Sequence, residues 1–358
     1  MSDTSSTTGP AVAAPSAAPA TKDTRGKRRR IRRIVVVSVT ALLAIVCGAM
    51  VSTYVVAEQL AANVHRIQGV FPKGGTVADS AVLTAAKGSM TILLTGSDSV
   101  SAAPSGTGAG RTQQPSGLIA IVHLNAGRRS GAVVSIPPET VVPVPGHGTT
   151  QIENALVFGG PALLIRTVQN LTSVRIDHYA VVDFQDLTNV VNALGGVNVD
   201  LPQQTASYYG VGFQAGVNHL NGIAALAYVR QGSISEDQRV GRQQNLLRAI
   251  LQKIAGQNLL GNPFRAYGIV HAFTGALSVD SNFSNRQLMS LATSARSFSA
   301  GGSTFVTVPV RPAGTLGGQI AASLVAAPSA KLWQAIRTDS VAAFARQNPA
   351  TVTSLAPR

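Results

Sequence analysis

The sequence predicts an α/β layered domain preceded by one membrane-spanning helix, and three observations lead to this prediction. Short apolar runs alternate with helix-like segments after residue 88, as expected of helices packed on a β-sheet. An uncharged run at 34–56 directly follows a cluster of basic residues. A third segment, 237–255, has the apolar spacing of a helix packed on a core.

The predicted strands are apolar runs of the kind buried on both faces of a sheet. They are residues 90–95, 118–124, 132–136, 179–184 and 197–201. Two helices are predicted between them, at 161–171 with Pro161 in the first helical position and at 184–194 before Gly195-Gly196. The C-terminal half is predicted to hold helices at 221–229, 237–255, 263–276, 284–298 and 329–337, with a strand at 304–310.

The first 33 residues form a basic tail, of which 1–21 are rich in Ser, Thr, Ala and Pro, a composition predicted to be disordered. Residues 34–56 carry no charge and are long enough to cross a bilayer as a helix. A cleaved signal peptide is the alternative, but its apolar region is usually shorter. Because basic residues stay inside, we expect a single-pass protein of the cytoplasmic membrane, its N-terminus inside and its domain facing the cell wall.

The rest of the chain is divided on the same grounds. We expect a stalk or linker at 57–87, helical from Glu58, then one extracytoplasmic domain at 88–345 and a frayed C-terminus at 346–358. The single cysteine, Cys47, falls in the membrane segment, so no disulfide is expected.

The charge balance is strongly basic, with a net charge of +14. Eight of the 29 basic residues and two of the 15 acidic ones precede Ile34, which leaves 21 basic and 13 acidic residues after it. The basic tail is explained by membrane topology, and the expected orientation separates the domain from DNA, so no nucleic-acid partner is predicted. The excess cations of the domain instead suggest an anionic ligand.

The helix at 237–255 indicates where that ligand binds. Its apolar stripe runs through Leu246, Ile250 and Ile254, and one or two turns earlier the same face carries Arg239, Arg242 and Gln243. Buried arginines need an anion, and a phosphate accepts two parallel bonds from a guanidinium. Pairing with internal acids such as Glu236 or Asp237 is the alternative.

Other motifs are less specific. Asp98 ends a predicted strand, where open α/β sheets place ligands, and a glycine-rich loop follows it. That loop matches no complete phosphate-binding or dinucleotide pattern, and a surface insertion explains it better. The six histidines show no paired metal-ligand spacing and no Gly-x-Ser-x-Gly motif occurs, so a zinc site or a serine hydrolase has little support. His123 and His178 are interpreted as structural.

A series of motifs in a fixed order resembles the LytR-CpsA-Psr family in its actinobacterial form. They include Gly-Ser-Asp-Ser at 96–99, Val-Val-Ser-Ile-Pro at 133–137, Gly-Gly-Pro-Ala-Leu at 159–163, Arg-Ile-Asp-His-Tyr at 175–179, Ala-Leu-Gly-Gly-Val at 193–197, Ala-Leu-Ala-Tyr-Val-Arg at 225–230 and Arg-x-x-Arg-Gln-Gln at 239–244. The resemblance covers residues 90–337 and implies a central mixed β-sheet between helical layers, with a long apolar pocket for a polyprenyl tail.

The resemblance also implies an activity. Family members transfer a glycopolymer from a polyprenyl pyrophosphate carrier to cell-wall peptidoglycan, with Mg²⁺ on the pyrophosphate. It implies pyrophosphate binding and catalysis for Arg230, Arg239 and Arg242, and metal binding for Asp98. Pyrophosphate or lipid contacts are expected for Arg111, Gln243, Leu246 and Ile250, and a catalytic role for Glu139, which stands where the family has an aspartate.

The sequence departs from the family pattern around the metal. The second metal aspartate is absent, since the nearest match reads Arg111-Thr112-Gln113 and a gapless alignment gives Pro115-Ser116-Gly117. Other losses are an Arg at Pro138, an Asp at Glu139, and arginines at Gly232 and Val100. Losing one carboxylate should weaken Mg²⁺ binding, because this ion keeps few protein ligands. Glu139 is the candidate replacement.

Two hypotheses follow. The chain is either an active glycopolymer–peptidoglycan phosphotransferase, weakened or with rearranged metal ligation, or a non-catalytic binder of polyprenyl pyrophosphate that scaffolds or regulates cell-wall assembly. The family pattern favours the first, and the missing Asp and Arg favour the second.

Overall fold

The computed structural model describes residues 64–71, 85–98, 114–127, 130–208, 210–230, 236–255, 263–294 and 303–352. The chain divides into two compact units, Met1–Val56 and Ala57–Arg358, and every described residue belongs to the second. The predicted membrane segment at 34–56 therefore lies outside the described residues. Among the helices that are described, none is both long and apolar enough to cross a membrane.

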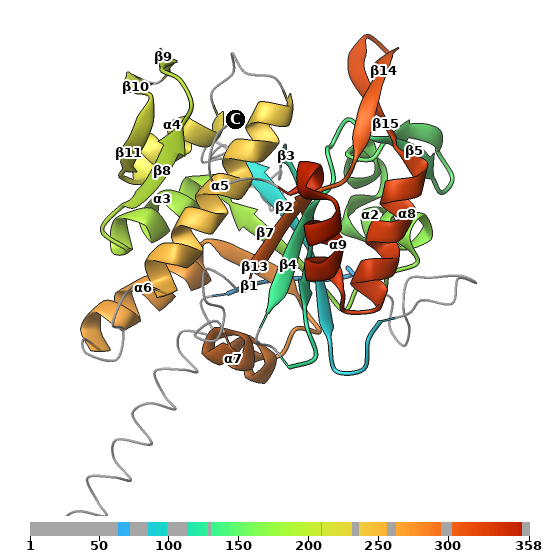
Figure 1. Cartoon of the computed structure of the whole chain (residues 1–358). Helices are drawn as coiled ribbons and strands as arrows, with labels where there is room; N and C mark the ends of the chain where they lie inside the picture. The colour runs from blue at the N-terminus through green and yellow to red at the C-terminus, as the bar shows by residue number, and fades with distance from the viewer. Residues whose placement is uncertain are drawn as a thin grey trace, which may run out of the picture. The chain divides into compact units, whose positions relative to one another are not determined.

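A mixed seven-stranded sheet lies at the centre of the described fold (Figure 1). Its strand order is β1-β12-β7-β2-β3-β4-β13. The strands are β1 (His65–Ile67), β12 (Leu277–Asp280), β7 (His178–Asp183), β2 (Met90–Asp98), β3 (Gln114–Leu124), β4 (Gly131–Ser135) and β13 (Ser303–Thr307). β2 is parallel to β7 and antiparallel to β3, while β4 is antiparallel to β3 and parallel to β13. The predicted central mixed sheet is confirmed.

Helices cover the two faces of this sheet as two separate layers (Figure 1). One layer contains α2 (Asn154–Thr172), α8 (Ala326–Arg337) and α9 (Val341–Gln347), and the other contains α3 (Phe184–Ala193), α4 (Gly222–Arg230), α5 (Glu236–Ala255) and α6 (Pro263–Gly275). A further helix, α7 (Asn285–Ser294), packs Leu288 against a smaller cluster that contains Ile92 and Val279.

Four two-stranded pairs complete the fold. They are β5 (Val141–Val144) with β6 (Gly148–Gln151), β8 (Val197–Leu201) with β11 (Gly216–Leu220), β9 (Thr205–Tyr208) with β10 (Val211–Phe213), and β14 (Val310–Leu316) with β15 (Gln319–Leu324). A single 3-10 turn, η1 (Pro349–Thr351), follows α9.

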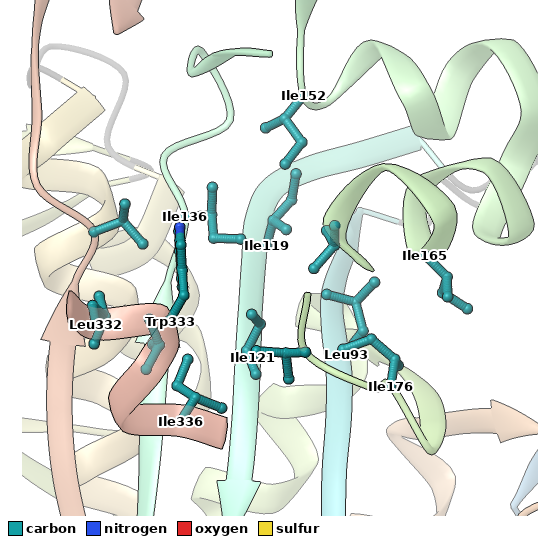
Figure 2. Close-up of a cluster of buried hydrophobic side chains, with 14 of the residues drawn as sticks. Leu93, Ile119, Ile121, Ile136, Ile152, Ile165, Ile176, Leu332, Trp333 and Ile336 are labelled. Carbon is teal, nitrogen blue, oxygen red and sulfur yellow. The ribbon is translucent and has the colours of Figure 1, made fainter. Parts of the chain in front are cut away.

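The core between the sheet and the α2, α8 and α9 layer is aliphatic. Leu93 of β2 and Ile121 of β3 are fully buried there, and Leu332, Trp333 and Ile336 of α8 pack against them (Figure 2). We call this core the closed side of the sheet. The opposite core, formed with α3, α4, α5 and α6, is called the helix-α5 side.

Local signals explain several helix ends. Asp183 caps α3 by accepting bonds from the backbone N–H groups of Gln185 at 2.8 Å and Asp186 at 3.3 Å. Helix α2 is broken at Gly159 and Gly160, where φ of Gly160 is +63°, and restarts at Pro161. The predicted helix at 161–171, with Pro161 in its first position, is therefore confirmed.

Three expectations from sequence differ from the structure. The helical stalk expected from Glu58 is wrong at His65–Ile67, because these residues form β1 and pair with β12. The burial of 197–201 on both faces is also wrong: β8 lies in a separate pair and exposes Asn198 and Asp200. The fraying expected from residue 346 is wrong as far as Val352, which forms a bridge with Val306 of β13.

Candidate functional site

The carboxyl ends of four strands meet at one edge of the central sheet. β2, β7, β4 and β13 run in the same direction, so Asp98, Asp183, Ser135 and Thr307 end their strands on this side. Open α/β sheets bind ligands at such an edge. Asp183 caps α3, so the segments after Asp98 and Ser135 are the candidate ligand contacts.

The segment after Ser135 holds Glu139 in a fixed place. Thr140 donates to the carbonyl oxygen of Pro137 through its N–H at 3.1 Å and its hydroxyl at 2.6 Å. The carbonyl oxygen of Glu139 accepts a 3.1 Å bond from the N–H of Ala322 in β15. The Glu139 side chain is buried, with 7% of its surface exposed. A buried carboxylate therefore lies next to the candidate ligand-binding edge.

On the helix-α5 side of the sheet, α5 packs beside α4 and buries one of the predicted cations, Arg242. A guanidinium nitrogen of Arg242 donates to the carbonyl oxygen of Tyr228 at 3.3 Å, and the guanidinium carbon lies 5.2 Å from the centre of the Tyr228 ring. Tyr228 is two residues from Arg230, the last residue of α4. The packing of the two helices thus places the arginine-bearing turn of α5 beside the end of α4.

Burial changes the ionisation of this pair. Arg242 is 8% exposed, and burial lowers the pKa of its guanidinium. Burial also raises the pKa of Tyr228, opposed by a side-chain hydrogen bond from Asn245 and by the positive charge of Arg242. Gln243 is 3% exposed, so the predicted burial of Arg242 and Gln243 is confirmed. The Arg239 side chain lies outside the described part of α5.

Arg248 is a second buried arginine that the sequence analysis missed. It is 8% exposed, its guanidinium carbon lies 4.4 Å from the centre of the Phe305 ring in β13, and burial lowers its pKa. On the helix it lies away from the Leu246 and Ile250 stripe, so the apolar spacing of α5 gives no sign that it is buried. Its burial depends on contact with Phe305, which is distant in the sequence.

Leu246 and Ile250 are 1% and 2% exposed and belong to the core of the helix-α5 side, where Ile254 also packs. Their support of a long lipid pocket stays a prediction. A pocket described on α5 has a different lining, which contains Asn245, Ala249 and Gln252 and lies against β8 and β11.

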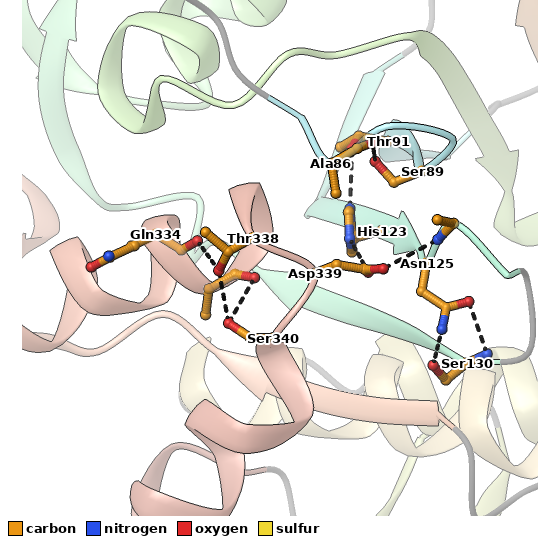
Figure 3. A network of polar contacts seen from close by, with 12 residues as sticks. Ala86, Ser89, Thr91, His123, Asn125, Ser130, Gln334, Thr338, Asp339 and Ser340 are labelled. Carbon is orange, nitrogen blue, oxygen red and sulfur yellow. Dashed lines mark hydrogen bonds and ion pairs between the residues drawn. The ribbon is translucent and has the colours of Figure 1, made fainter.

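Two histidines have the structural roles that were predicted. His123 Nε2 lies 2.9 Å from the carboxylate of Asp339 and its Nδ1 lies 3.2 Å from the Thr91 hydroxyl, in the network of Figure 3. His178 Nδ1 lies 3.1 Å from the carboxylate of Asp280, and its ring stacks on Phe283 with centroids 3.9 Å apart. Both rings connect elements of the fold.

The residues predicted to bind a metal are only partly within the described structure. Asp98 pairs with Gln114 across β2 and β3, but its side chain is outside the described part, as is the whole of Arg111. Among the described residues there is no group of three or more His, Cys, Asp or Glu side chains placed to hold a metal. Of the acidic residues described at this edge, Asp183 caps α3, which leaves Glu139 and Asp98 as the candidate metal ligands.

The chain matches the model of one known protein family over most of its length. The model of the LytR_cpsA_psr family matches residues 52–338. The chain belongs to the LytR_cpsA_psr family. The match begins upstream of β1 and ends after α8, so it includes the whole central sheet and the layers on both of its faces.

Relatives of this family member have cell-wall names. It is 34% identical over 208 residues to "Probable cell wall biosynthesis protein LcpB" of Corynebacterium glutamicum, covering 57% of this chain and 48% of the relative. It is 31% identical over 158 residues to "Polyisoprenyl-teichoic acid--peptidoglycan teichoic acid transferase TagU" of Enterococcus faecalis, covering 43% and 52%. The chain spans about half the length of the curated relatives it matches.

Solved structures share the fold. "Crystal structure of B. subtilis TagV" matches with a TM-score of 0.59 and 22% identity, covering 71% of this chain and 98% of that one. "LytR-Csp2A-Psr enzyme from Actinomyces oris" matches with a TM-score of 0.56 and 20% identity, covering 76% and 94%. The predicted α/β fold and family are confirmed.

Proposed function

We propose that this chain is a membrane-anchored phosphotransferase that attaches a glycopolymer from a polyprenyl pyrophosphate carrier to cell-wall peptidoglycan. Family membership and the transferase names of relatives support the reaction class. The observation that carries the proposal in this chain is the burial of Arg242 and Gln243 on the turn of α5 that lies beside the end of α4, where Arg242 contacts Tyr228. A guanidinium held in this place favours an anionic ligand that can accept charge-assisted hydrogen bonds, such as a pyrophosphate.

The chemistry is phosphoryl transfer. A hydroxyl of peptidoglycan attacks the phosphorus that carries the glycopolymer, and a new P–O bond forms. The bond from that phosphorus to the bridging oxygen breaks, polyprenyl phosphate leaves, and the hydroxyl proton passes to solvent. Such reactions depend mainly on positioning and charge neutralisation. Arg230, Arg239, Arg242 and Gln243 bind the pyrophosphate, with Arg111 as a further contact, and Leu246 and Ile250 support the prenyl chain.

Magnesium is part of this proposal. Glu139 and Asp98 are the residues that would hold it, and the bound ion would neutralise charge on the pyrophosphate. Oxygen donors suit Mg²⁺, which in phosphate sites is typically held by one or two carboxylates with the substrate oxygens and waters. Burial of Glu139 beside the sheet edge supports its role as a ligand in place of the aspartate that the family pattern leads one to expect.

We also propose a location for the chain in the cytoplasmic membrane. The apolar run at 34–56 anchors the chain in the cytoplasmic membrane, and the basic tail keeps the N-terminus inside. A reporter active only in the cytoplasm, fused after Arg358, should be silent in living cells. Reporter activity in an intact fusion would reverse the proposed topology.

A non-catalytic polyprenyl-pyrophosphate binder is the second candidate, and one observation favours it. The residue that pairs with Asp98 on β3 is Gln114, and neither it nor any neighbour on that strand end supplies the expected second carboxylate. Pro138 likewise gives no cation beside Glu139. Such losses typically cost about 10²–10³ in rate for each charge-stabilising group. The binder would scaffold or regulate an active relative.

Turnover by the full-length protein in detergent separates the two. The assay combines a polyprenyl-pyrophosphate oligosaccharide, a peptidoglycan fragment, and either Mg²⁺ or a chelator. We expect reduced but measurable transfer that needs Mg²⁺ and is lost in Glu139→Gln or Asp98→Ala. Tight lipid binding without transfer, with turnover gained in the triple variant Gln113→Asp, Pro138→Arg and Glu139→Asp, would identify the binder instead.

A further inference from the structure

A separate pocket lies between α5 and the β8–β11 pair. Its volume is about 250 Å³. The lining residues are Asn198, Val199 and Asp200 of β8, Val217 of β11, and Asn245, Ala249 and Gln252 of α5. Ligand pockets for drug-sized molecules measure roughly 300–1,000 Å³, so this pocket suits a single ring-sized group.

The lining determines which chemical class fits. Its polar side chains are three amides and one carboxylate, and no basic residue is among them. Amides both donate and accept hydrogen bonds, while a carboxylate accepts them. This combination suits the hydroxyl groups of a neutral sugar. It does not suit a phosphate, because the carboxylate of Asp200 would repel it and no basic residue of the lining would compensate. It does not suit a prenyl chain either, which would leave these polar groups without partners.

Asn245 connects this pocket with the arginine site. Its side chain bonds the Tyr228 hydroxyl. Its Oδ1 atom is buried and has no hydrogen-bond partner in the described part of the chain. A buried acceptor without a partner is unfavourable by about 1–3 kcal/mol, so a rotation of the Asn245 amide that lets a ligand hydroxyl reach Oδ1 from the pocket would be favourable. Arg242 lies three residues earlier on the same helix, about 4.5 Å along its axis.

We propose that the pocket lined by Asn198, Asp200, Asn245 and Gln252 binds one hydroxyl-rich sugar residue beside the pyrophosphate-binding turn of α5. The sugar belongs either to the carried glycopolymer or to the peptidoglycan acceptor, and this assignment of its source rests on the proposed function. The binding itself follows from the lining and from Asn245, independently of any transfer reaction.

Titration of the full-length protein in detergent with two oligosaccharides tests the proposal. Chitotetraose carries the N-acetyl groups of peptidoglycan sugars, and maltotetraose represents a neutral hexose polymer. Calorimetry should detect saturable binding of at least one, and the preferred sugar indicates the source. We expect a loss of affinity of about tenfold in Asn245→Leu and about threefold in Gln252→Ala, as for one or two lost hydrogen bonds. Gln334→Ala, on the exposed surface of α8, is the matched control and should bind as the unmodified protein does.

Geranylgeranyl pyrophosphate, titrated in parallel, separates this proposal from the proposed function. Gln252→Ala should keep its affinity for this probe while losing affinity for the sugar. Sugar binding that persists in a protein unable to bind the pyrophosphate would contradict the proposed function and leave the sugar pocket standing. Absence of saturable binding of either sugar, or equal binding by both pocket variants and the control, would overturn the sugar pocket.

Discussion

The closed side and the helix-α5 side of the central sheet differ in what they bury. On the closed side α2, α8 and α9 cover the sheet with aliphatic residues, and a polar pair such as Thr95 and Tyr179 is satisfied internally by a 2.7 Å hydrogen bond. On the other side α5 buries Arg242 and Arg248 against aromatic rings. Burying a charge is expensive unless it is paired, so two buried arginines on one helix distinguish this side from the aliphatic one. The helix-α5 side is therefore the side proposed to bind the ligand.

The largest effect should come from removing the arginines of α5. The double variant Arg239→Ala and Arg242→Ala should lower affinity for geranylgeranyl pyrophosphate by at least about a hundredfold, since truncating one partner of a buried charge pair costs about 2–5 kcal/mol. Calorimetry on the full-length protein measures the loss. Arg346→Ala, on the exposed face of α9, is the control. Unchanged affinity in a well-folded double variant would show that these arginines are structural and that the two sides do not differ in function.

A matched pair of isoleucines tests whether the helix-α5 side is packed as tightly as the closed side. Ile336 of α8 is 0% exposed and Ile250 of α5 is 2% exposed. Ile336→Ala should lower the free energy of unfolding by about 2–5 kcal/mol, as expected for a filled core. Ile250→Ala should lower it by less than half as much if Ile250 borders a cavity for the prenyl chain, because fewer packed contacts are then lost.

Urea unfolding of both variants at neutral pH gives these values, with the same titration repeated after adding geranylgeranyl pyrophosphate. The ligand should raise the free energy of unfolding of the unmodified protein by more than it does for Ile250→Ala. For Ile336→Ala the rise should be as large as for the unmodified protein. Equal losses for the two isoleucines, with equal stabilisation by the ligand, would contradict a lipid pocket next to Ile250.

Alkaline pH should also separate the two sides, through one buried tyrosine on each. Burial raises the pKa of Tyr179 from 10.0 to about 12, although the bond with Thr95 opposes this rise. Below pH 10 the side chain is protonated in both states and its contribution to stability is complete. Between pH 10 and 12 the unfolded chain loses the proton first, so stability falls by on the order of 3 kcal/mol.

Unfolding free energies of the unmodified protein and Tyr179→Phe, compared between pH 9 and 12, measure this contribution. Phe cannot ionise, so the variant should lose less stability over that range. The pKa of Tyr228 is also raised by burial, but Asn245 and Arg242 both oppose the rise. Tyr228→Phe should therefore reduce the alkaline loss by less than Tyr179→Phe does. A larger effect at Tyr228 would contradict the stabilising role of Arg242 beside it.

Much of the fold could be predicted because its signals are local. The helix predicted at 184–194 appears as α3 because its apolar residues have helical spacing, Asp183 is a capping residue and two glycines follow. The burial of Arg242 and Gln243 could be predicted from the phase of the stripe that continues through Leu246. These inferences depend only on residues within a few turns of one another.

What could not be predicted depends on distant partners. The three residues of β1 form a strand only because β12, about 210 residues later, lies beside them. Strand β14 is exposed along nearly its whole length, so it lacks the buried alternation that marks a strand. For the site, the contacts of Tyr228 with Arg242 and of Arg248 with Phe305 arise from helix packing and sheet position. No spacing within α5 contains that information.

The smallest change in stability that we predict is at the contact between the α8–α9 connection and the closed side of the sheet. The carboxylate of Asp339, between these helices, is paired with His123 at 2.9 Å and accepts a 3.2 Å bond from the N–H of Ala126 (Figure 3). Asp339 has a φ of +59°, which Asn tolerates better than most residues do. Asp339→Asn should therefore lower the free energy of unfolding by about 1 kcal/mol, through weaker hydrogen bonds alone. Asp339→Ala should cost more, because it removes both bonds and disfavours the backbone conformation.

Since this contact lies far from α5 in the chain and on the other side of the sheet, neither variant should change affinity for geranylgeranyl pyrophosphate. A matching loss of ligand affinity in Asp339→Asn would show that the two sides of the sheet are coupled.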